Sequence, residues 1–396
     1  MNLNMNTNRE ARTEKRERVA LPLSVDLPNR HRHVRHRLTE LGLDGLIVTN
    51  PTNVRYLSNH VGTAGTLVLT RSGVHLLVDF RYQESARATQ ASPGACPDLR
   101  IWPVPASYDE ALVHVLAEVG GSTMGIEAAH LTVARMEWLE RTLASRGLAV
   151  ALRSTERVVE QVRLVKSSTE IEMLREACGR LGDVAGAAFA AVRVGITERE
   201  VAGVIEEAIR RAGYDRLAFD TIVASGPNSA LPHHRSGSRK LSAGDLVVLD
   251  FGGVLDGYCC DLTRTVSVGA PAPDARRLHA AVREAQQAAS EAVKPGVTAA
   301  AVDAAARRLL ESRGLGEAFG HGTGHGLGLD VHEEPRVGPP RADSPSVQLE
   351  PGMVFTIEPG AYLPGMGGVR VEDDVLVTDT GCEVLTSVPR ELLALP

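Results

Sequence analysis

Five side chains in the C-terminal half of the 396-residue sequence have the types and spacing of a site for two metal ions: Asp250, Asp261, His325, Glu358 and Glu372. Four carboxylates and one imidazole are the ligands that two neighbouring hard or borderline divalent cations require. Without a cation, four acids brought close together would repel one another and raise one another's pKa values. The first hypothesis is therefore a two-metal centre suited to hydrolysis.

The four acids form two pairs, and each pair flanks a stretch with glycines suited to a turn. Asp250 and Asp261 flank the segment GGVLDG, and Glu358 and Glu372 flank PGAYLPGMGG. Each pair therefore predicts one acid on each arm of a β-hairpin. Since side chains alternate across a strand, facing positions can point to the same side of the sheet.

Two helical segments are expected before each hairpin. Apolar residues at three- and four-residue steps predict a helix over residues 168–191. Helices are also expected over residues 197–213, 274–292 and 298–313. Ser168 and Thr197, each with glutamates close behind, suit helix starts. The half-chain thus predicts helix, helix, hairpin, twice over. Two such units facing each other would bring all four acids to one central site, a weak internal duplication inferred from pattern.

The segments around these residues resemble the pita-bread metallopeptidases (peptidase family M24B and its relatives), which include methionine aminopeptidase, aminopeptidase P and prolidase. The resemblance is carried by LDFGG (249–253), DLTRT (261–265), HGTGHGLGLDVHE (321–333), TIEPG (356–360) and GVRVEDD (368–374). The N-terminal half resembles the smaller domain of prolidase, aminopeptidase P and creatinase, which methionine aminopeptidase lacks, through RLTELGLDGLIVTNPTNVRYLS (37–58) and VDFRY (78–82).

The resemblance implies an α+β fold class, with a C-terminal pita-bread (creatinase/aminopeptidase) domain of internal pseudo-twofold symmetry and a smaller N-terminal α/β creatinase-like domain. The length also favours two domains, because 396 residues exceed the usual size of one core. We expect a disordered tail over 1–25, the N-terminal domain over 26–155 and the catalytic domain over 156–396. Residues 1–25 are polar, of mixed charge, and contain no apolar signal core.

Short apolar segments in the N-terminal domain alternate with helical ones, which favours an α/β layer structure. The strands are expected over residues 45–49, 66–70, 75–79 and 101–104. Residues 130–147 are expected to form the last helix of this domain. The charged segment 152–166 is expected to carry the chain across to the second domain.

The overall composition gives no electrostatic or hydrophobic reason to expect nucleic-acid or membrane binding. The net charge is −6, and no apolar run approaches the ~18 residues needed to span a bilayer. Five cysteines, an odd number, argue against a disulfide framework. We therefore expect a cytoplasmic protein that acts on a small molecule.

The resemblance implies a role for each ligand. Asp261 and Glu372 would bridge two metal ions, Asp250 would bind one of them, and His325 with Glu358 would bind the other. Two cations held ~3.5–4 Å apart share a water and lower its pKa, and the bridging hydroxide attacks the scissile carbonyl. Glu358 would carry the proton to the leaving nitrogen. One histidine among four carboxylates favours Mn²⁺, with Co²⁺ or Zn²⁺ as alternatives.

Three further histidines are candidates: His321 and His332 lie in HGTGHGLGLDVHE, and His233 lies in a segment that also resembles prolidase-like sequences. The resemblance implies that His233, in SALPHHRS, and His332, in LGLDVHE, donate hydrogen bonds to the substrate or to the tetrahedral oxyanion. His234, next to His233, is the less favoured of the two adjacent histidines. For His321 two alternatives stay open, a substrate contact and a position behind the metal ligands.

Two arginines complete the set of candidates. Arg370 lies two residues before Glu372, so on a strand it shares that ligand's face and could orient the acids. Arg336 follows the sequence HEEP. In prolidase-like sequences an arginine at this place binds the terminal carboxylate of the substrate, a task suited to a bidentate guanidinium. The alternative for Arg336 is a solvated loop residue.

The function that this set favours is hydrolysis of the Xaa-Pro bond, most directly by an Xaa-Pro dipeptidase (prolidase). Proline has no amide N–H and restricts the residue before it, so its peptide bond suits a dedicated enzyme. The alternative is an aminopeptidase P acting on longer peptides. A creatinase-like hydrolase without metal and a non-catalytic peptide-binding module are remote, because all five ligand positions are filled. The resemblance also implies a homodimer.

Overall fold

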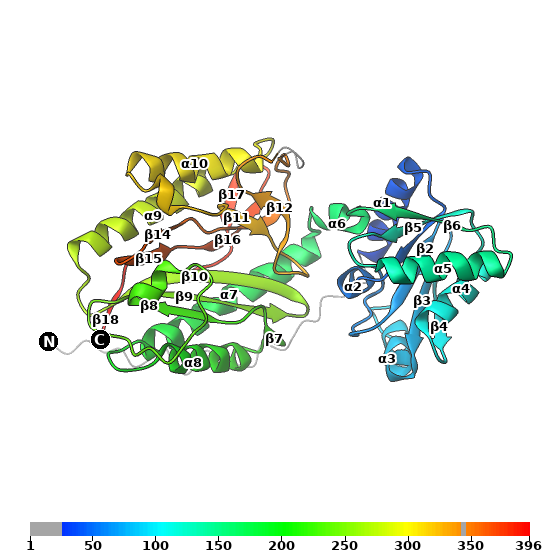
Figure 1. Ribbon diagram of the computed structural model, residues 1–396, viewed down its shortest axis with the longest axis horizontal. Coiled ribbons are helices and arrows are strands. Elements are labelled where there is room, and N and C mark those ends of the chain that lie inside the picture. Colours follow the sequence, from blue (N-terminus) through cyan, green and yellow to red (C-terminus); the bar gives the residue numbers. More distant parts are fainter. Residues whose placement is uncertain (1–25, 342–345) are drawn as a thin grey trace.

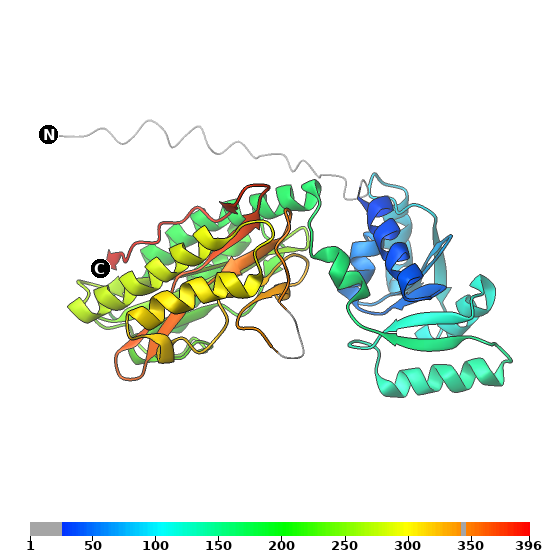
Figure 2. The ribbon, with the colours of Figure 1, turned by 90° about the horizontal axis from the view of Figure 1, so that it is seen from above.

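The protein is described by a computed structural model that covers residues 26–341 and 346–396. The tail predicted over 1–25 lies outside the described residues. The chain forms two lobes, which Figures 1 and 2 show side by side. Helices α1–α5 and strands β1–β6 form one lobe, helices α7–α10 and strands β7–β18 form the other, and α6 lies at the junction. No helix within these residues has the length and apolar composition to cross a bilayer.

The N-terminal domain is built on one mixed sheet of six strands in the order β4-β3-β2-β1-β5-β6. Its strands are β1 Gly45–Val48, β2 Thr66–Thr70, β3 Val74–Asp79, β4 Leu99–Val104, β5 Thr123–Glu127 and β6 Ala151–Thr155. Its helices, with the junction helix, are α1 Leu27–Glu40, α2 Pro51–Ser58, α3 Phe80–Gln90, α4 Tyr108–Val119, α5 Val133–Ser145 and α6 Val158–Arg163. The four strands expected from the sequence are confirmed as β1–β4.

Alternation along β1 explains why both faces of this sheet are covered by helices. Leu46 and Val48 pack in one buried cluster with residues of α1 and α2. Ile47 packs in another cluster with Leu112 of α4 and Leu139 of α5. Successive side chains of a strand point to opposite faces, so a continuously apolar strand belongs in the middle of an α/β/α layer.

The segment 152–166, which is expected to carry the chain across to the second domain, also contains regular structure. The chain over Ala151–Thr155 is strand β6, which pairs in parallel with β5, and Val158–Arg163 is helix α6. Strand β6 is at the edge of the sheet, and most of its residues are exposed or half-buried. An edge strand with few buried side chains has no alternating apolar pattern, so no strand could be recognised here from the sequence.

The C-terminal domain contains the same motif twice, two helices followed by a strand pair. The elements of the first unit are α7 Ser168–Ala191, α8 Glu198–Arg211, β9 Leu246–Leu255 and β10 Tyr258–Val268. Those of the second are α9 Pro273–Ala292, α10 Ala299–Ser312, β13 Val354–Ile357 and β16 Asp373–Val377. The predicted duplication is confirmed. The remaining elements are β7 Arg216–Leu217, β8 Ile222–Ser225, η3 Gly226–Ala230, η4 Gly316–Ala318, β11 Gly324–Gly326, β12 Glu333–Val337, β14 Gly360–Leu363, β15 Gly367–Arg370, β17 Cys382–Val384 and β18 Ala394–Leu395.

The first helix pair begins at capping boxes. The side chain of Ser167 accepts a hydrogen bond from the amide of Glu170, whose carboxylate returns to the Ser167 amide, and Thr197 and Glu200 do the same for α8. The cap of α7 is therefore Ser167, one residue before the serine expected. In Figure 1 the strands lie between the two helix pairs, with α7 and α8 on one side and α9 and α10 on the other.

The first hairpin, β9–β10, places its two acids on one face. Its turn is Asp256-Gly257, with positive φ at both residues (47° and 87°), as a two-residue type I′ turn needs. Asp250 is opposite Thr263, and Asp261 is opposite Gly252. Because residues two apart share a face, Asp250 and Asp261 point to the same side in a diagonal arrangement.

The second hairpin is interrupted where its acids stand. Strands β13 and β16 pair on the side of the interruption away from the turn, with Ile357 opposite Asp373. Strands β14 and β15 pair on the side of the turn, with Gly360 opposite Arg370. The register is the same on both sides. Glu358 is therefore directly opposite Glu372, at a point where neither residue belongs to a strand. Each acid still lies on one arm of a hairpin, as predicted.

One buried guanidinium joins the two domains. Arg163 of α6, whose side chain is 3% exposed, donates to Asn53 Oδ1 of the N-terminal domain at 2.7 Å. Its other terminal nitrogen donates to Asp330 Oδ2 at 2.8 Å and also bonds Glu333, both in the C-terminal domain. Thr52 Oγ1 donates to the second oxygen of Asp330 at 2.9 Å. The segment 330–333, which includes His332, is thus held from the N-terminal side.

We expect the Arg163→Met variant to lose about 3 kcal/mol of unfolding free energy, because the buried carboxylate of Glu333 loses one of its two cationic partners and keeps only Lys166 at 3.6 Å. Urea unfolding followed by circular dichroism measures this loss. The matched control is Arg175→Met, which breaks the partly exposed ion pair with Glu383 (side chains 46% and 37% exposed). That pair should be worth less than about 1 kcal/mol. Equal losses in the two variants would contradict the role given to Arg163.

Candidate metal centre and active site

All the residues singled out in the sequence line one cavity of about 890 Å³ in the C-terminal domain. The cavity contains the five candidate ligands and the five other candidates: Asp250, Asp261, His325, Glu358, Glu372, His233, His321, His332, Arg336 and Arg370. Its opposite wall is formed by one face of α8 and by the segment 219–222. Residues more than 100 positions apart in the chain therefore meet at one place.

The candidate ligands come from both hairpins and from the glycine-rich strand β11. Ligand atoms of Asp261, His325 and Glu372 all lie within 4.8 Å of one another. His325 Nε2 is 3.4 Å from Glu358 Oε1 and 4.0 Å from Asp261 Oδ2. Three carboxylates and one imidazole thus converge, and the fourth acid, Asp250, is tied to Arg370 beside them.

The backbone of β11 fixes the orientation of His325. Its Nδ1 lies 3.1 Å from the Gly326 carbonyl, which can only accept, so Nδ1 carries the proton and Nε2 presents a lone pair to the acids. Burial lowers the pKa of His325, which favours this neutral form. A Cβ at Gly324 would lie 1.9 Å from the Thr356 carbonyl oxygen, so only glycine lets the strand approach this closely.

Burial and mutual repulsion make the acids a poor fit to a site without cations. Burial first, and then the charge of neighbouring carboxylates, raises the pKa values of Asp261 and Glu372 well above their usual range. Oxygen Oδ1 of Asp261 is buried without a hydrogen-bond partner among the described residues. Oxygen-rich ligands with one imidazole and an unpartnered carboxylate oxygen fit divalent cations.

Arg370 partly offsets the negative charge. Its Nη2 donates to Asp250 Oδ2 at 2.5 Å, and its Nε donates to Thr263 Oγ1 at 3.1 Å. The Thr263 hydroxyl in turn donates to Glu372 Oε2 at 2.6 Å. Arg370 is therefore connected to one acid of each hairpin, on the face where strand alternation placed it. Such contacts orient ligands that would otherwise repel one another.

A chain of hydrogen bonds leads from Arg370 to His321. Arg370 Nη1 donates to the Tyr362 hydroxyl at 2.8 Å, and that hydroxyl lies 3.0 Å from His321 Nε2. His321 Nδ1 lies 2.7 Å from the Gly322 carbonyl and must be the donor there, so Nε2 accepts from Tyr362. Both ring nitrogens have protein partners. Of the two alternatives for His321, this arrangement favours the position behind the ligands.

His233 and His332 are exposed residues on the wall of the same cavity. Among the described residues, neither imidazole has a hydrogen-bond partner in the protein. The rings of His332 and His325 are 4.3 Å apart, centroid to centroid, in an edge arrangement. The ring nitrogens of His233 and His332 are thus available to a molecule in the cavity, next to the candidate metal ligands.

Arg336 also lines the cavity, and its side chain makes few interactions with the rest of the protein. Its Nη1 donates to the Pro339 carbonyl at 2.8 Å, and no carboxylate is paired with its guanidinium in the described part of the chain. The nearby Glu334 instead pairs with Arg157, at 2.6 Å. The guanidinium is therefore free to bind an anionic group of a molecule in the cavity.

Four residues that support the site were missed in the sequence: Thr263, Thr356, Tyr362 and Asp374. Thr356 Oγ1 donates to Glu358 Oε1 at 3.3 Å. Asp374 Oδ2 accepts from the Asp261 amide at 2.9 Å and from Cys178 Sγ at 3.2 Å, and burial raises the pKa of Asp374 to about 7. Thr263, Thr356 and Asp374 each lie two residues from a ligand, so strand alternation could have identified them.

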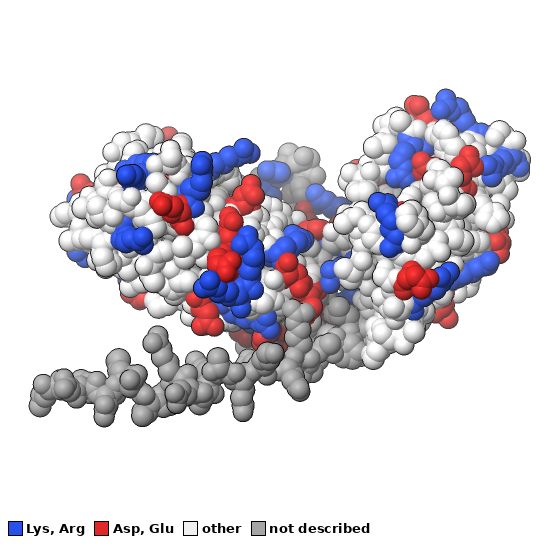
Figure 3. Space-filling view, turned by 90° about the horizontal axis from the view of Figure 1, so that it is seen from below, with Lys and Arg blue, Asp and Glu red and all other residues white. Residues whose placement is uncertain are grey.

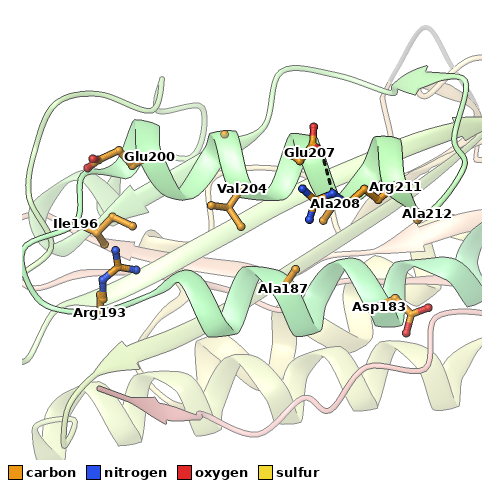
Figure 4. A pocket seen from close by; sticks show the side chains of 11 residues that line it. Asp183, Ala187, Arg193, Ile196, Glu200, Val204, Glu207, Ala208, Arg211 and Ala212 are labelled. Atoms are coloured by element: carbon orange, nitrogen blue, oxygen red, sulfur yellow. Dashed lines mark hydrogen bonds and ion pairs between the residues drawn. The ribbon is translucent and has the colours of Figure 1, made fainter. Parts of the chain in front are cut away.

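A second hollow, of about 730 Å³, lies between α7 and α8 (Figure 4). Its lining combines small apolar residues such as Ala187 and Val204 with charged ones such as Glu207 and Arg211, which pair at 2.9 Å. It contains none of the candidate ligands. On the face shown in Figure 3, acidic and basic side chains are interspersed over both lobes. The convergent chemistry is therefore in the first cavity.

Known proteins share both domains of this chain. The family model for metallopeptidase family M24 matches residues 172–379, and that for the creatinase/prolidase N-terminal domain matches residues 30–165. The Xaa-Pro dipeptidase of Pyrococcus furiosus is 43% identical over 236 residues, which are 60% of this chain and 67% of that protein.

Solved structures have the same fold. The Xaa-Pro dipeptidase from Bacillus anthracis matches with a TM-score of 0.87 at 35% identity, over 93% of this chain and 100% of that one. The X-Pro aminopeptidase from Thermotoga maritima matches with a TM-score of 0.81 at 32% identity, over 92% of this chain and 99% of that one. These matches confirm the α+β architecture expected, a creatinase-like domain followed by a pita-bread domain. The chain belongs to metallopeptidase family M24, in its prolidase subfamily, and is a metallopeptidase.

Proposed function

We propose that this metallopeptidase is an Xaa-Pro dipeptidase, which hydrolyses the bond between a first residue and a proline in second position. The observation that carries the proposal is the content of one cavity. Five ligand-competent side chains line it, together with two imidazoles without hydrogen-bond partners and an arginine without a carboxylate partner among the described residues. This is the equipment needed to bind a small zwitterion and cleave its amide bond.

Asp250, Asp261, His325, Glu358 and Glu372 would hold two divalent cations, with Asp261 and Glu372 shared between them. Bound cations would act as Lewis acids that acidify a water molecule and polarise the scissile carbonyl. The single imidazole among oxygen ligands favours Mn²⁺ over the softer choices, with Co²⁺ and Zn²⁺ as alternatives. Arg370 would orient Asp250 toward this role, because its guanidinium donates a hydrogen bond to that carboxylate.

Glu358 would move protons during hydrolysis. Burial raises the pKa of its carboxyl, partly offset by the charge of Arg370, so its carboxylate is a stronger base than an exposed glutamate. The Thr356 hydroxyl orients one of its oxygens at 3.3 Å. Glu358 would take a proton from the attacking water and deliver it to the proline nitrogen as that bond breaks.

His233 and His332, which come from two different segments of the C-terminal domain, would both donate hydrogen bonds to the peptide. Neither ring has a hydrogen-bond partner among the described residues, and both line the cavity. A donor that meets the carbonyl oxygen as its negative charge develops stabilises the transition state more than the ground state. Arg336 would bind the carboxylate of the C-terminal proline and so fix which bond lies near the acids.

The second candidate is an aminopeptidase P, which releases the first residue from longer Xaa-Pro peptides. The similarity to the Thermotoga maritima X-Pro aminopeptidase favours it, because that match covers 92% of this chain. The two candidates share the metal centre and the proton transfers. They differ in whether the far end of the cavity binds a terminal carboxylate or lets the chain continue.

The decisive assay compares hydrolysis of Ala-Pro and Ala-Pro-Ala by the full chain supplied with Mn²⁺. We expect kcat/KM for Ala-Pro to be at least about 10-fold higher than for Ala-Pro-Ala. A factor of this size corresponds to the loss of one charge-assisted hydrogen bond to the carboxylate of the proline. Comparable or better cleavage of the tripeptide would instead identify an aminopeptidase P. Ala-Ala is the control for the requirement for proline.

Replacing a shared ligand should remove metal and activity together. We expect the Asp261→Ala variant to lose bound Mn²⁺ and to lower kcat/KM by more than the roughly 10–100-fold typical of residues that only support ligands. Metal content by mass spectrometry of the desalted protein and Ala-Pro hydrolysis measure the two effects. Asp274→Ala removes an exposed acid of α9 as a control (side chain 58% exposed). Full activity of Asp261→Ala would rule out the two-metal centre.

Removing Arg336 should weaken dipeptide binding selectively. We expect Arg336→Ala to raise KM for Ala-Pro by roughly 10- to 100-fold, because a hydrogen-bonded charge is lost. The same variant should leave hydrolysis of Ala-Pro amide nearly unchanged, since that substrate has no terminal carboxylate. Equal effects on the acid and the amide would make Arg336 a loop residue.

A further inference from the structure

A buried carboxylate faces the loop that carries His233. Glu198 is the first residue of α8 and is 0% exposed. The loop it faces, residues 225–237, which we name the His233 loop, runs from the end of β8 through η3 to Gly237. Figure 1 shows α8 and β8 on the same side of the C-terminal domain. The mechanism described above does not use Glu198.

Both oxygens of Glu198 are fully occupied by donors from the His233 loop. Oε1 accepts from the Ser225 amide (2.9 Å), Ser225 Oγ (2.7 Å) and Asn228 Nδ2 (2.9 Å), and Oε2 accepts from His234 Nε2 (2.8 Å) and the Gly237 amide (3.1 Å). Burial raises the pKa of Glu198, but these hydrogen bonds outweigh it, so the pKa is lowered overall. The carboxylate is therefore ionised and can only accept.

The two adjacent histidines of the loop have different tasks. Because Oε2 of Glu198 can only accept, His234 Nε2 carries a proton and points at the carboxylate. His233 has no protein partner among the described residues and faces the cavity. The loop is also tied on its other side, where Ser229 Oγ accepts from the Gly368 amide at 2.8 Å. One imidazole anchors the loop, and the other is presented to the substrate.

We propose that Glu198 and His234 are positioning residues, which hold the His233 loop so that His233 meets the substrate in one fixed geometry. The inference rests on the proposed function, because it takes His233 as a substrate contact. A displacement of about 1 Å at a reacting group can lower the rate roughly 100-fold. A loop residue that is itself exposed needs an anchor that is buried, and Glu198 accepts five hydrogen bonds from the segments on both sides of His233.

A double-mutant cycle separates this role from a general effect on folding. The variants are His233→Ala, His234→Leu and the pair together, assayed with Mn²⁺ on whichever of Ala-Pro and Ala-Pro-Ala the wild type cleaves. We expect His234→Leu to lower kcat/KM by roughly 10- to 100-fold, as residues behind a contact do. In the His233→Ala background the same substitution should cost less than about 2-fold, because the residue it positions is gone.

A conservative replacement and an unrelated one serve as controls. His234→Gln places an amide N–H near the position of Nε2, so it should retain activity within about 3-fold of the wild type. His114→Leu removes an exposed histidine of α4 (68% exposed side chain) and should change nothing. His234, with a side chain only 16% exposed, is chosen over Glu198 because a substitution at Glu198 would leave five donors facing the wrong partner.

The outcomes distinguish the two levels of the argument. Losses that multiply in the double variant, or a His234→Gln as damaged as His234→Leu, would overturn the positioning role while leaving the proposed function intact. Full activity of His234→Leu would overturn it as well. A wild type that cleaves neither peptide would overturn the proposed function, and the positioning role with it.

Discussion

The constraint on which this structure depends is the burial of four carboxylates around one point. Three of them, Asp250, Asp261 and Glu372, are 8% or less exposed, and burial with the charge of neighbouring carboxylates raises the pKa values of Asp261 and Glu372. Charges out of water are costly unless opposite charge and hydrogen bonds compensate them. One guanidinium, that of Arg370, and a few hydroxyl groups are not enough for four acids. Divalent cations, which a metallopeptidase of this family binds, would supply the remaining compensation.

The pita-bread architecture meets this constraint by symmetry and by a second layer of ion pairs. Each repeated unit delivers two acids on one hairpin, so no single segment has to bring all of the negative charge together. Behind the ligands, Arg264 donates to Asp373 at 2.7 Å and also bonds the carbonyl of Glu372. That buried pair fixes the backbone at the interruption of the second hairpin. The ligands are thus held by backbone geometry rather than by mutual attraction, which they lack.

Local patterns made much of this predictable, and long-range contacts made the rest invisible. The helices around 168–191 and 298–313 could be located because their caps and apolar steps are local, and the acids could be paired because turns are local. The same alternation that placed Arg370 would have placed Thr263 and Asp374. By contrast, strand β6 has too few buried residues to be recognised. Contacts such as Tyr362 with His321, 41 residues apart, leave no pattern at all in one sequence.

The two histidines proposed to touch the peptide show why reactive loops need distant anchors. His233 and His332 must be exposed to reach a substrate, and exposed loop residues are seldom rigid by themselves. Each stands beside a buried charged residue that is not itself reactive. Glu198 holds the residues around His233, and Arg163 holds both acids that flank His332. Because Arg163 also bonds Asn53, the N-terminal domain contributes to the geometry of a site that its described residues do not line. Buried charged groups from both domains therefore support the segments that carry these two histidines.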